Sequence, residues 1–270
     1  MTALPLTWLY APGDRPHVVA KALACGADVV VVDLEDAVAP DRKAYARDAT
    51  AELLGEPQPV PVHVRVNALD GPWAAADVRA VAALPGVAGL RLPKVTSAQD
   101  VVGVAERTGL PLFALLESAL AIERAYAVAA AHPLLRGVAL GEADLRADLG
   151  VSDDAGLDWC RSRVVVAARA AGLPPPTQSV HPDIRDLEGL AASCAHGRAL
   201  GFLGRAAIHP RQLPVIERAY LPTRAEIEQA ETIVKAAATG QGALALPDGR
   251  FVDAAVVAAA QRTLALADRS

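Results

Sequence analysis

Carboxylates follow several of the apolar stretches in this chain. One stretch, VVVVDLEDAV (residues 29–38), passes from four consecutive valines directly into three acids. Two later stretches, PLFALLES and GVALGEAD, also end in acids. The acids are Asp33, Glu35 and Asp36 in the first stretch, Glu117 in the second, and Glu142 and Asp144 in the third. Any one of them could cap a helix or pair with an arginine, so their recurrence is what indicates a site.

Glu117 and Asp144 form the favoured pair for a metal ion. If their stretches are neighbouring parallel strands, the two carboxylates come close together and repel each other unless a cation lies between them. Mg²⁺ binds one or two protein carboxylates and leaves its other positions to water and substrate. The sequence has no cluster of histidine and cysteine that would favour zinc. Glu142 is the less favoured partner, and Glu117 could instead be held by hydrogen bonds to neighbouring strands.

Cations accompany these acids. In PVHVRVNA (residues 61–68) valines alternate with polar residues, which places Arg65 on the polar face. A buried arginine needs an anion, either a substrate or a structural carboxylate. Lys94 ends another apolar stretch, where only a desolvated site beside Arg65 would lower its pKa enough for a Schiff base. Arg15 and Lys21 lie near an expected helix start, which favours anions, but exposed cations are also ordinary at a surface.

Eight short apolar stretches alternate with helical patterns along the chain. The stretches expected to form strands are residues 7–13, 28–36, 61–68, 89–94, 111–118, 137–144, 176–184 and 206–210. This count and spacing predict a (β/α)8 TIM barrel, in which active sites lie at the carboxyl ends of the strands. A doubly wound sheet is the alternative, but it needs fewer strands and usually a glycine-rich first turn, which is not found here. The acids therefore fall where barrel chemistry is expected.

We expect the barrel to occupy residues 1–221. Residues 222–270 predict a helix, a glycine-rich turn region and a last helix, which is too short for an independent domain. This C-terminal helical extension is expected to pack on its own barrel or on a neighbouring subunit.

The bulk composition excludes several classes of protein. The chain has 270 residues, 53% of them hydrophobic, so it can bury a sizeable core. Its net charge is −5 and it has no long basic run, which argues against a nucleic-acid partner. No apolar run is long enough to span a membrane. Three cysteines without a C-x-x-C pair fit free thiols in a reducing compartment, so we expect a soluble cytoplasmic protein.

An ordered set of motifs goes further than composition. Together it resembles the citrate lyase β-subunit-like family, within the HpcH/HpaI aldolase and citrate lyase superfamily, from about residue 6 to residue 260. The motifs are LYAPGDRPHVVAKALACGADVVVVDLEDAVAPDRKAYAR, VRVNA, LPKV, LLES, GEADLRADLG and AIHPRQLPVI. The resemblance implies a (β/α)8 barrel, usually a homotrimer and sometimes a hexamer. It also implies a Mg²⁺-dependent enzyme that cleaves or forms a carbon–carbon bond in β-hydroxyacyl-CoA thioesters.

The resemblance assigns roles to individual residues. It implies that Glu117 and Asp144 bind Mg²⁺ and that Arg65 holds substrate oxygens. It places Arg15 in the coenzyme A and substrate region, with Lys21 as a plausible phosphate contact.

The same resemblance implies supporting and lid residues. Glu35 and Asp36 are expected to order Arg65, the metal-bound waters and Lys94. The segment GRFVDAAVV resembles a lid whose aspartate, here Asp253, reaches a neighbouring subunit's site, although Asp253 could simply cap the following helix. Ser118 stands where the family often has threonine and can still donate a hydrogen bond to substrate. The residues that follow it, Leu120 and Ala121, also differ from the family pattern.

The sequence thus predicts a lyase acting on malyl-, citramalyl- or hydroxymethylglutaryl-CoA, with acetyl-CoA and an α-keto acid or acetoacetate as products. One alternative is a CoA-independent 4-hydroxy-2-oxo-acid aldolase. The other is a citrate lyase β subunit that needs partner subunits.

Overall fold

The computed structural model describes residues 4–239, 244–245 and 251–269. They belong to two compact units, one over Pro5–Glu217 and a second that runs from Arg218 onward and includes Leu4. The predicted boundary at residue 221 lies a few residues after this division. Each unit is described by itself.

The first unit is built on a parallel sheet of seven strands in the order β6-β5-β4-β3-β2-β1-β7. The strands are β1 (Thr7–Pro12), β2 (Val29–Asp33), β3 (Val62–Arg65), β4 (Val87–Leu92), β5 (Leu112–Leu116), β6 (Leu135–Leu140) and β7 (Arg205–Ala207). Every residue of β2 is buried, which explains its unbroken run of valines.

The stretch expected to be the seventh strand is reduced to two bridged residues. Thr177 pairs with Ala139 of β6, and Gln178 pairs with Arg205 of β7, so the ring closes through this segment. The prediction of a full strand over residues 176–184 was wrong in extent. Three consecutive prolines, 174–176, and Pro182 bracket the segment, and proline cannot donate to a strand ladder. The (β/α)8 barrel is otherwise confirmed, with β7 in the place of the eighth strand.

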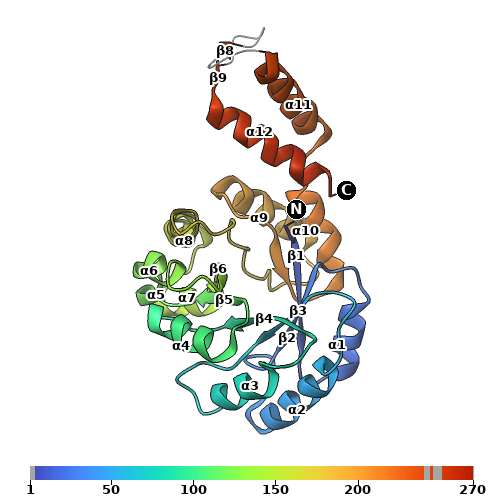
Figure 1. The fold of residues 1–270 in the computed structure, drawn as a ribbon, viewed down its shortest axis with the longest axis vertical. Helices are drawn as coiled ribbons and strands as arrows, with labels where there is room; N and C mark the ends of the chain where they lie inside the picture. The colour runs from blue at the N-terminus through green and yellow to red at the C-terminus, as the bar shows by residue number, and fades with distance from the viewer. Residues whose placement is uncertain (1–3, 240–243, 246–250, 270) are drawn as a thin grey trace. The chain divides into compact units, whose positions relative to one another are not determined.

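Helices surround the strands of this unit (Figure 1). They are α1 (Pro16–Leu23), α2 (Lys43–Leu54), α3 (Ala74–Val81), α4 (Ala98–Thr108), α5 (Ala119–Glu123), α6 (Ala125–Ala129), α7 (Glu142–Leu149), α8 (Asp158–Ala170), α9 (Leu187–Leu200) and α10 (Leu213–Tyr220), whose last three residues belong to the second unit. Helix α4 begins with a capping box, in which Ser97 accepts from the N–H of Asp100 and Asp100 accepts from that of Ser97.

Aromatic rings fill the barrel interior on the amino-terminal side of the acids. Phe113 of β5 stacks on His63 of β3 with ring centroids 4.3 Å apart. Glycines on the two strands beside β5 make room for this ring, because a Cβ at Gly89 or Gly137 would lie 2.9 or 3.2 Å from it. Burial lowers the pKa of His63 well below its ordinary value, with Arg91 adding to the effect, so His63 is neutral.

The second unit is a pair of helices with a short hairpin. Helices α11 (Arg224–Thr239) and α12 (Ala254–Ala267) pack through buried residues that include Ile233 and Ala260. Strands β8 (Leu244–Ala245) and β9 (Phe251–Val252) pair antiparallel. The first two residues of the lid-like segment, 249 and 250, lie outside the described residues.

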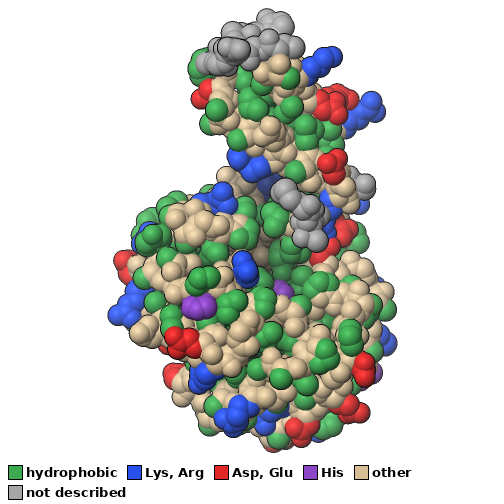
Figure 2. Space-filling model, in the orientation of Figure 1, with side chains coloured by type: hydrophobic (Ala, Val, Ile, Leu, Met, Phe, Trp, Pro, Cys, Tyr) green, Lys and Arg blue, Asp and Glu red, His purple; other side chains and the backbone are tan. Residues whose placement is uncertain are grey.

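Charges of both signs are interspersed on the face of the barrel unit drawn in Figure 2. Within the described residues, every helix is too short or too polar to span a lipid bilayer.

Candidate active site

A cavity of about 430 Å³ lies at the carboxyl ends of the barrel strands. Its lining includes Asp33 at the end of β2, Arg65 at the end of β3, and Glu117 directly after β5. Asp36 and Asp144 also line it. Together with Glu142, which also lines the cavity, six of the acids and cations singled out in the sequence are therefore brought together from distant parts of the chain.

Arg65 is held by three carboxylates at the cavity wall. Its Nε and Nη2 donate to Asp33 at 2.7 and 2.6 Å, in a two-pronged pair, and Nη1 lies 2.9 Å from Glu35 Oε2. The exposed Asp36 is a weaker contact at 3.5 Å from Nη1. Burial disfavours the charged guanidinium, but Asp33 outweighs this and raises the pKa of Arg65. The expected ordering of Arg65 by Glu35 and Asp36 has a geometric basis, and Asp33 is the stronger partner.

Lys94 joins Glu35 to Glu117. Its Nζ contacts Glu35, while its backbone N–H donates to Glu117 Oε2 at 2.9 Å. Lys94 has a φ of 53°, a left-handed conformation uncommon outside glycine. Burial lowers the pKa of Lys94, but the hydrogen bond and charge of Glu35 outweigh it and raise the pKa to about 12. A neutral lysine for a Schiff base is therefore not supported.

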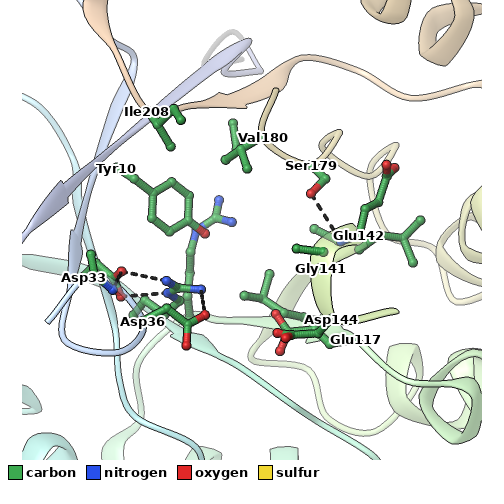
Figure 3. A pocket seen from close by; sticks show the side chains of 18 of the residues that line it. Tyr10, Asp33, Asp36, Glu117, Gly141, Glu142, Asp144, Ser179, Val180 and Ile208 are labelled. Atoms are coloured by element: carbon green, nitrogen blue, oxygen red, sulfur yellow. Dashed lines mark hydrogen bonds and ion pairs between the residues drawn. The ribbon is translucent and has the colours of Figure 1, made fainter. Parts of the chain in front are cut away.

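Glu117 and Asp144 lie beside each other (Figure 3). Burial raises the pKa of Glu117 to about 7, and the charges of Glu35 and Asp144 add to the effect. The side chain packs directly on Gly141, where any Cβ would lie 2.3 Å from Glu117 Oε1. Among the described residues no group of three or more His, Cys, Asp and Glu side chains could hold a metal. Two carboxylates suit an ion that keeps water ligands, and Mg²⁺ is such an ion.

Glu142 is committed elsewhere. Both of its oxygens accept from the buried Arg161, at 3.0 and 2.7 Å. In Figure 3 its carboxylate points away from Glu117 and Asp144. The geometry therefore favours Asp144 over Glu142 as the carboxylate beside Glu117, as predicted from the sequence.

The expected coenzyme A contacts lie outside the cavity lining. Arg15 precedes α1 and is exposed, with its Nε 4.0 Å from Asp14. Lys21 is in the last turn of α1, so only Arg15 stands near the helix start. Ser118 caps α5 by accepting from the N–H of Ala121 at 3.3 Å. The roles of these three residues in substrate binding stay predictions.

Asp253 caps a helix in the second unit. Its Oδ1 accepts from the N–H of Val256 at 2.9 Å, at the start of α12. The structural alternative weighed from the sequence is thus realised, and the catalytic role of Asp253 stays a prediction.

Arg91 of β4 also lines the cavity, and sequence reasoning missed it. It is a single charged residue inside the apolar stretch GLRLPK, and that interruption was the available signal.

Comparison with known proteins agrees with this geometry. A family model described as HpcH/HpaI aldolase/citrate lyase matches residues 6–210. The chain belongs to this family. The family predicted from the motifs is therefore confirmed, and it is a family of enzymes.

Relatives of this HpcH/HpaI family member cover nearly the whole chain. A (3S)-malyl-CoA thioesterase of Cereibacter sphaeroides is 38% identical over 275 residues, 96% of this chain and 93% of the relative. The citrate lyase subunit beta of Escherichia coli is 33% identical over 283 residues, 97% and 93% of the two chains. CitE of Mycobacterium tuberculosis, solved in complex with magnesium, acetoacetate and coenzyme A, has a TM-score of 0.85 at 35% identity and covers 99% of both chains.

Proposed function

We propose that this protein is a magnesium-dependent carbon–carbon lyase acting on a β-hydroxyacyl-CoA of the malyl-, citramalyl- or hydroxymethylglutaryl-CoA type. The products are acetyl-CoA and an α-keto acid or acetoacetate, and the reaction is reversible. The supporting observation is Glu117, whose burial beside other acids raises its pKa to about 7. A cation bound beside it would stabilise the ionised carboxylate. The magnesium and coenzyme A bound by CitE, and the malyl-CoA named for the Cereibacter relatives, support the substrate class.

Glu117 and Asp144 would hold the ion. Bound there, Mg²⁺ supplies a Lewis acid and a template for the hydroxyl and carboxylate oxygens of substrate. The Lys94 N–H and the close approach of Gly141 fix the Glu117 carboxylate in advance. A preorganised ligand loses less conformational entropy on binding.

Arg65 would stabilise the negative charge on the thioester oxygen as the carbon–carbon bond breaks. Its hydrogen bonds to Asp33 and Asp36 use three of its five N–H groups, Glu35 forms an ion pair with its Nη1, and one Nη2 hydrogen has no partner among the described residues. Asp33 and Glu35 keep the guanidinium in place, and Lys94 orders Glu35.

The remaining roles come from the family resemblance. Asp253 from a neighbouring subunit would exchange the proton on the acetyl methyl carbon. Arg15 and Lys21 would contact coenzyme A, and Ser118 would hydrogen-bond the acyl end. We propose a homotrimer or a hexamer as the assembly that brings Asp253 to the cavity.

Thioester hydrolysis is the second candidate, because the relatives at 38% identity are named thioesterases. Lysis of (3S)-malyl-CoA gives acetyl-CoA and glyoxylate, whereas hydrolysis gives malate and free CoA. Two further alternatives remain, a CoA-independent aldolase and a citrate lyase β subunit that works only with partner proteins.

The test is incubation of the purified protein with (3S)-malyl-CoA, citramalyl-CoA or hydroxymethylglutaryl-CoA, with Mg²⁺ or a chelator, followed by mass spectrometry. We expect Mg²⁺-dependent acetyl-CoA from one of them, and loss of product in Glu117→Gln. Free CoA with the hydroxy acid, and no acetyl-CoA, would replace lysis by hydrolysis. Cleavage of 4-hydroxy-2-oxo acids alone would favour the aldolase, and activity only with partner subunits would favour the citrate lyase assembly.

A further inference from the structure

Arg91 is a buried cation without an acid. The residue is 3% exposed and lines the cavity. No described carboxylate lies within 4.0 Å of its guanidinium, in contrast with Arg65, whose nearest acid is at 2.6 Å. Its Nε is buried and has no hydrogen-bond partner among the described residues.

The neighbours of Arg91 stabilise its charge only in part. Its guanidinium carbon lies 5.9 Å from the centroids of Trp8 and Tyr10 and 5.6 Å from that of Phe113. Cation–π attraction at such distances is weaker than a carboxylate pair. The guanidinium of Arg91 cannot relieve this cost by becoming neutral, because arginine does not lose its proton in proteins. A buried unpaired charge is strongly unfavourable, so this arrangement is one that a bound anion would complete.

The other charged residues that line the cavity do not offer a binding site for an anion. Arg65 already contacts Asp33, Glu35 and Asp36. Glu117 and Asp144 repel an anion unless a cation intervenes. Arg91 is therefore the cation of the described lining that has no carboxylate partner.

We propose that Arg91 determines specificity by binding a carboxylate on the acyl part of the substrate through its planar N–H fork. The carboxylate belongs to a small 2-oxo acid, or to the part of the acyl chain that becomes one. This assignment rests on the proposed function for its place in a reaction, but carboxylate binding at Arg91 can be measured without turnover.

The test uses Trp8 as a reporter. The chain has three tryptophans, so a Trp73→Phe, Trp159→Phe background leaves Trp8 alone, beside Arg91. With Mg²⁺ present, we expect pyruvate to change the emission of Trp8 saturably and its methyl ester to leave it unchanged. Arg91→Met should raise the Kd for pyruvate at least about tenfold, and Arg91→Lys should fall between. Arg107→Met, on the exposed face of α4, is the matched control and should bind as the parent does.

Melting temperatures separate a binding role from a structural one. Arg91→Met should melt at or above the parent temperature, because it removes an unpaired charge and keeps the apolar stem. Arg65→Met should melt lower, since it leaves Asp33 buried without its cation.

An unchanged Kd in Arg91→Met, or equal binding of the methyl ester, would overturn the proposal. So would the absence of any saturable response in the parent background. If pyruvate binding depends on Arg91 but no acyl-CoA is cleaved, the proposed function fails and the carboxylate site stands. If acyl-CoA is cleaved while pyruvate binding does not depend on Arg91, the carboxylate site fails and the proposed function stands.

Discussion

Glu117 carries an electrostatic penalty that a single metal ion would remove. The side chain is buried, and the charges that act on it include two other acids, Glu35 and Asp144, and one cation, Arg65. One oxygen receives the N–H of Lys94, which is too little to offset the burial. In the chelated protein this carboxylate is therefore under strain near neutral pH.

The first prediction concerns the variant Glu117→Gln and pH. The pKa of Glu117 is raised to about 7, above the ordinary value, so ionisation destabilises the folded chelated protein. Below the unfolded pKa both states are protonated and no penalty exists. The penalty grows as pH rises from the unfolded pKa to the folded pKa of Glu117. It is complete above pH 7, where it reaches about 3 kcal/mol.

Thermal melts in chelator measure this penalty. Glu117→Gln should melt above the parent at pH 8 and like the parent near pH 4. Added Mg²⁺ should raise the melting temperature of the parent at pH 8 and leave the variant unchanged. Equal melting curves in chelator at pH 8 would contradict the strained carboxylate.

At the scale of elements, the sequence pattern predicted the type and order of the strands better than their length. Seven of the eight expected strands are present, because unbroken apolar runs such as VVVV mark strands buried on both faces. Glycines mark helix ends in the sequence as well: Gly109 and Gly201 follow α4 and α9 with positive φ. The segment after Pro176 failed as a full strand because its prolines limit pairing.

The periodicity of a single strand predicts which face a side chain lies on, but not which residues of other strands it contacts. Arg65 was placed on the polar face correctly, but its partner depends on register between strands. Asp33 and Arg65 are register partners across β2 and β3, which no single stretch reveals. Arg91 is the register partner of Arg65 on β4, so its burial in the cavity also emerges only from the assembled barrel.

The second prediction separates capping from catalysis at Asp253. Asparagine caps helices as well as aspartate does, so Asp253→Asn should keep α12 intact while it removes the carboxylate. We expect kcat to fall at least about a hundredfold. Amide hydrogen exchange should show unchanged protection at the start of α12. Asp253→Ala should instead lose protection there, with about 1 kcal/mol of local stability.

Full activity in Asp253→Asn would remove Asp253 from the mechanism and leave it as a cap. Reduced activity in Asp253→Ala alone would mean the same, since only that variant disturbs the helix.

At the scale of the whole molecule, the proposed mechanism needs two chains to build one site. The barrel cavity supplies Glu117, Asp144 and Arg65, whereas Asp253 belongs to the second unit. If that unit serves a neighbouring barrel, a chain with a defective cavity can still provide a working Asp253.

The last prediction is complementation between two inactive variants. Glu117→Gln and Asp253→Asn should each be inactive alone, with the size of a trimer by light scattering. Co-expressed in equal amounts, they should assemble at random into a population that recovers about a quarter of parent activity, because half of all cavities are intact and half of those meet an intact Asp253. If Asp253 served its own barrel, no mixed trimer would contain a complete site. Mixed trimers, verified by differential tags, that stay inactive would therefore place Asp253 in its own chain's site or outside the reaction.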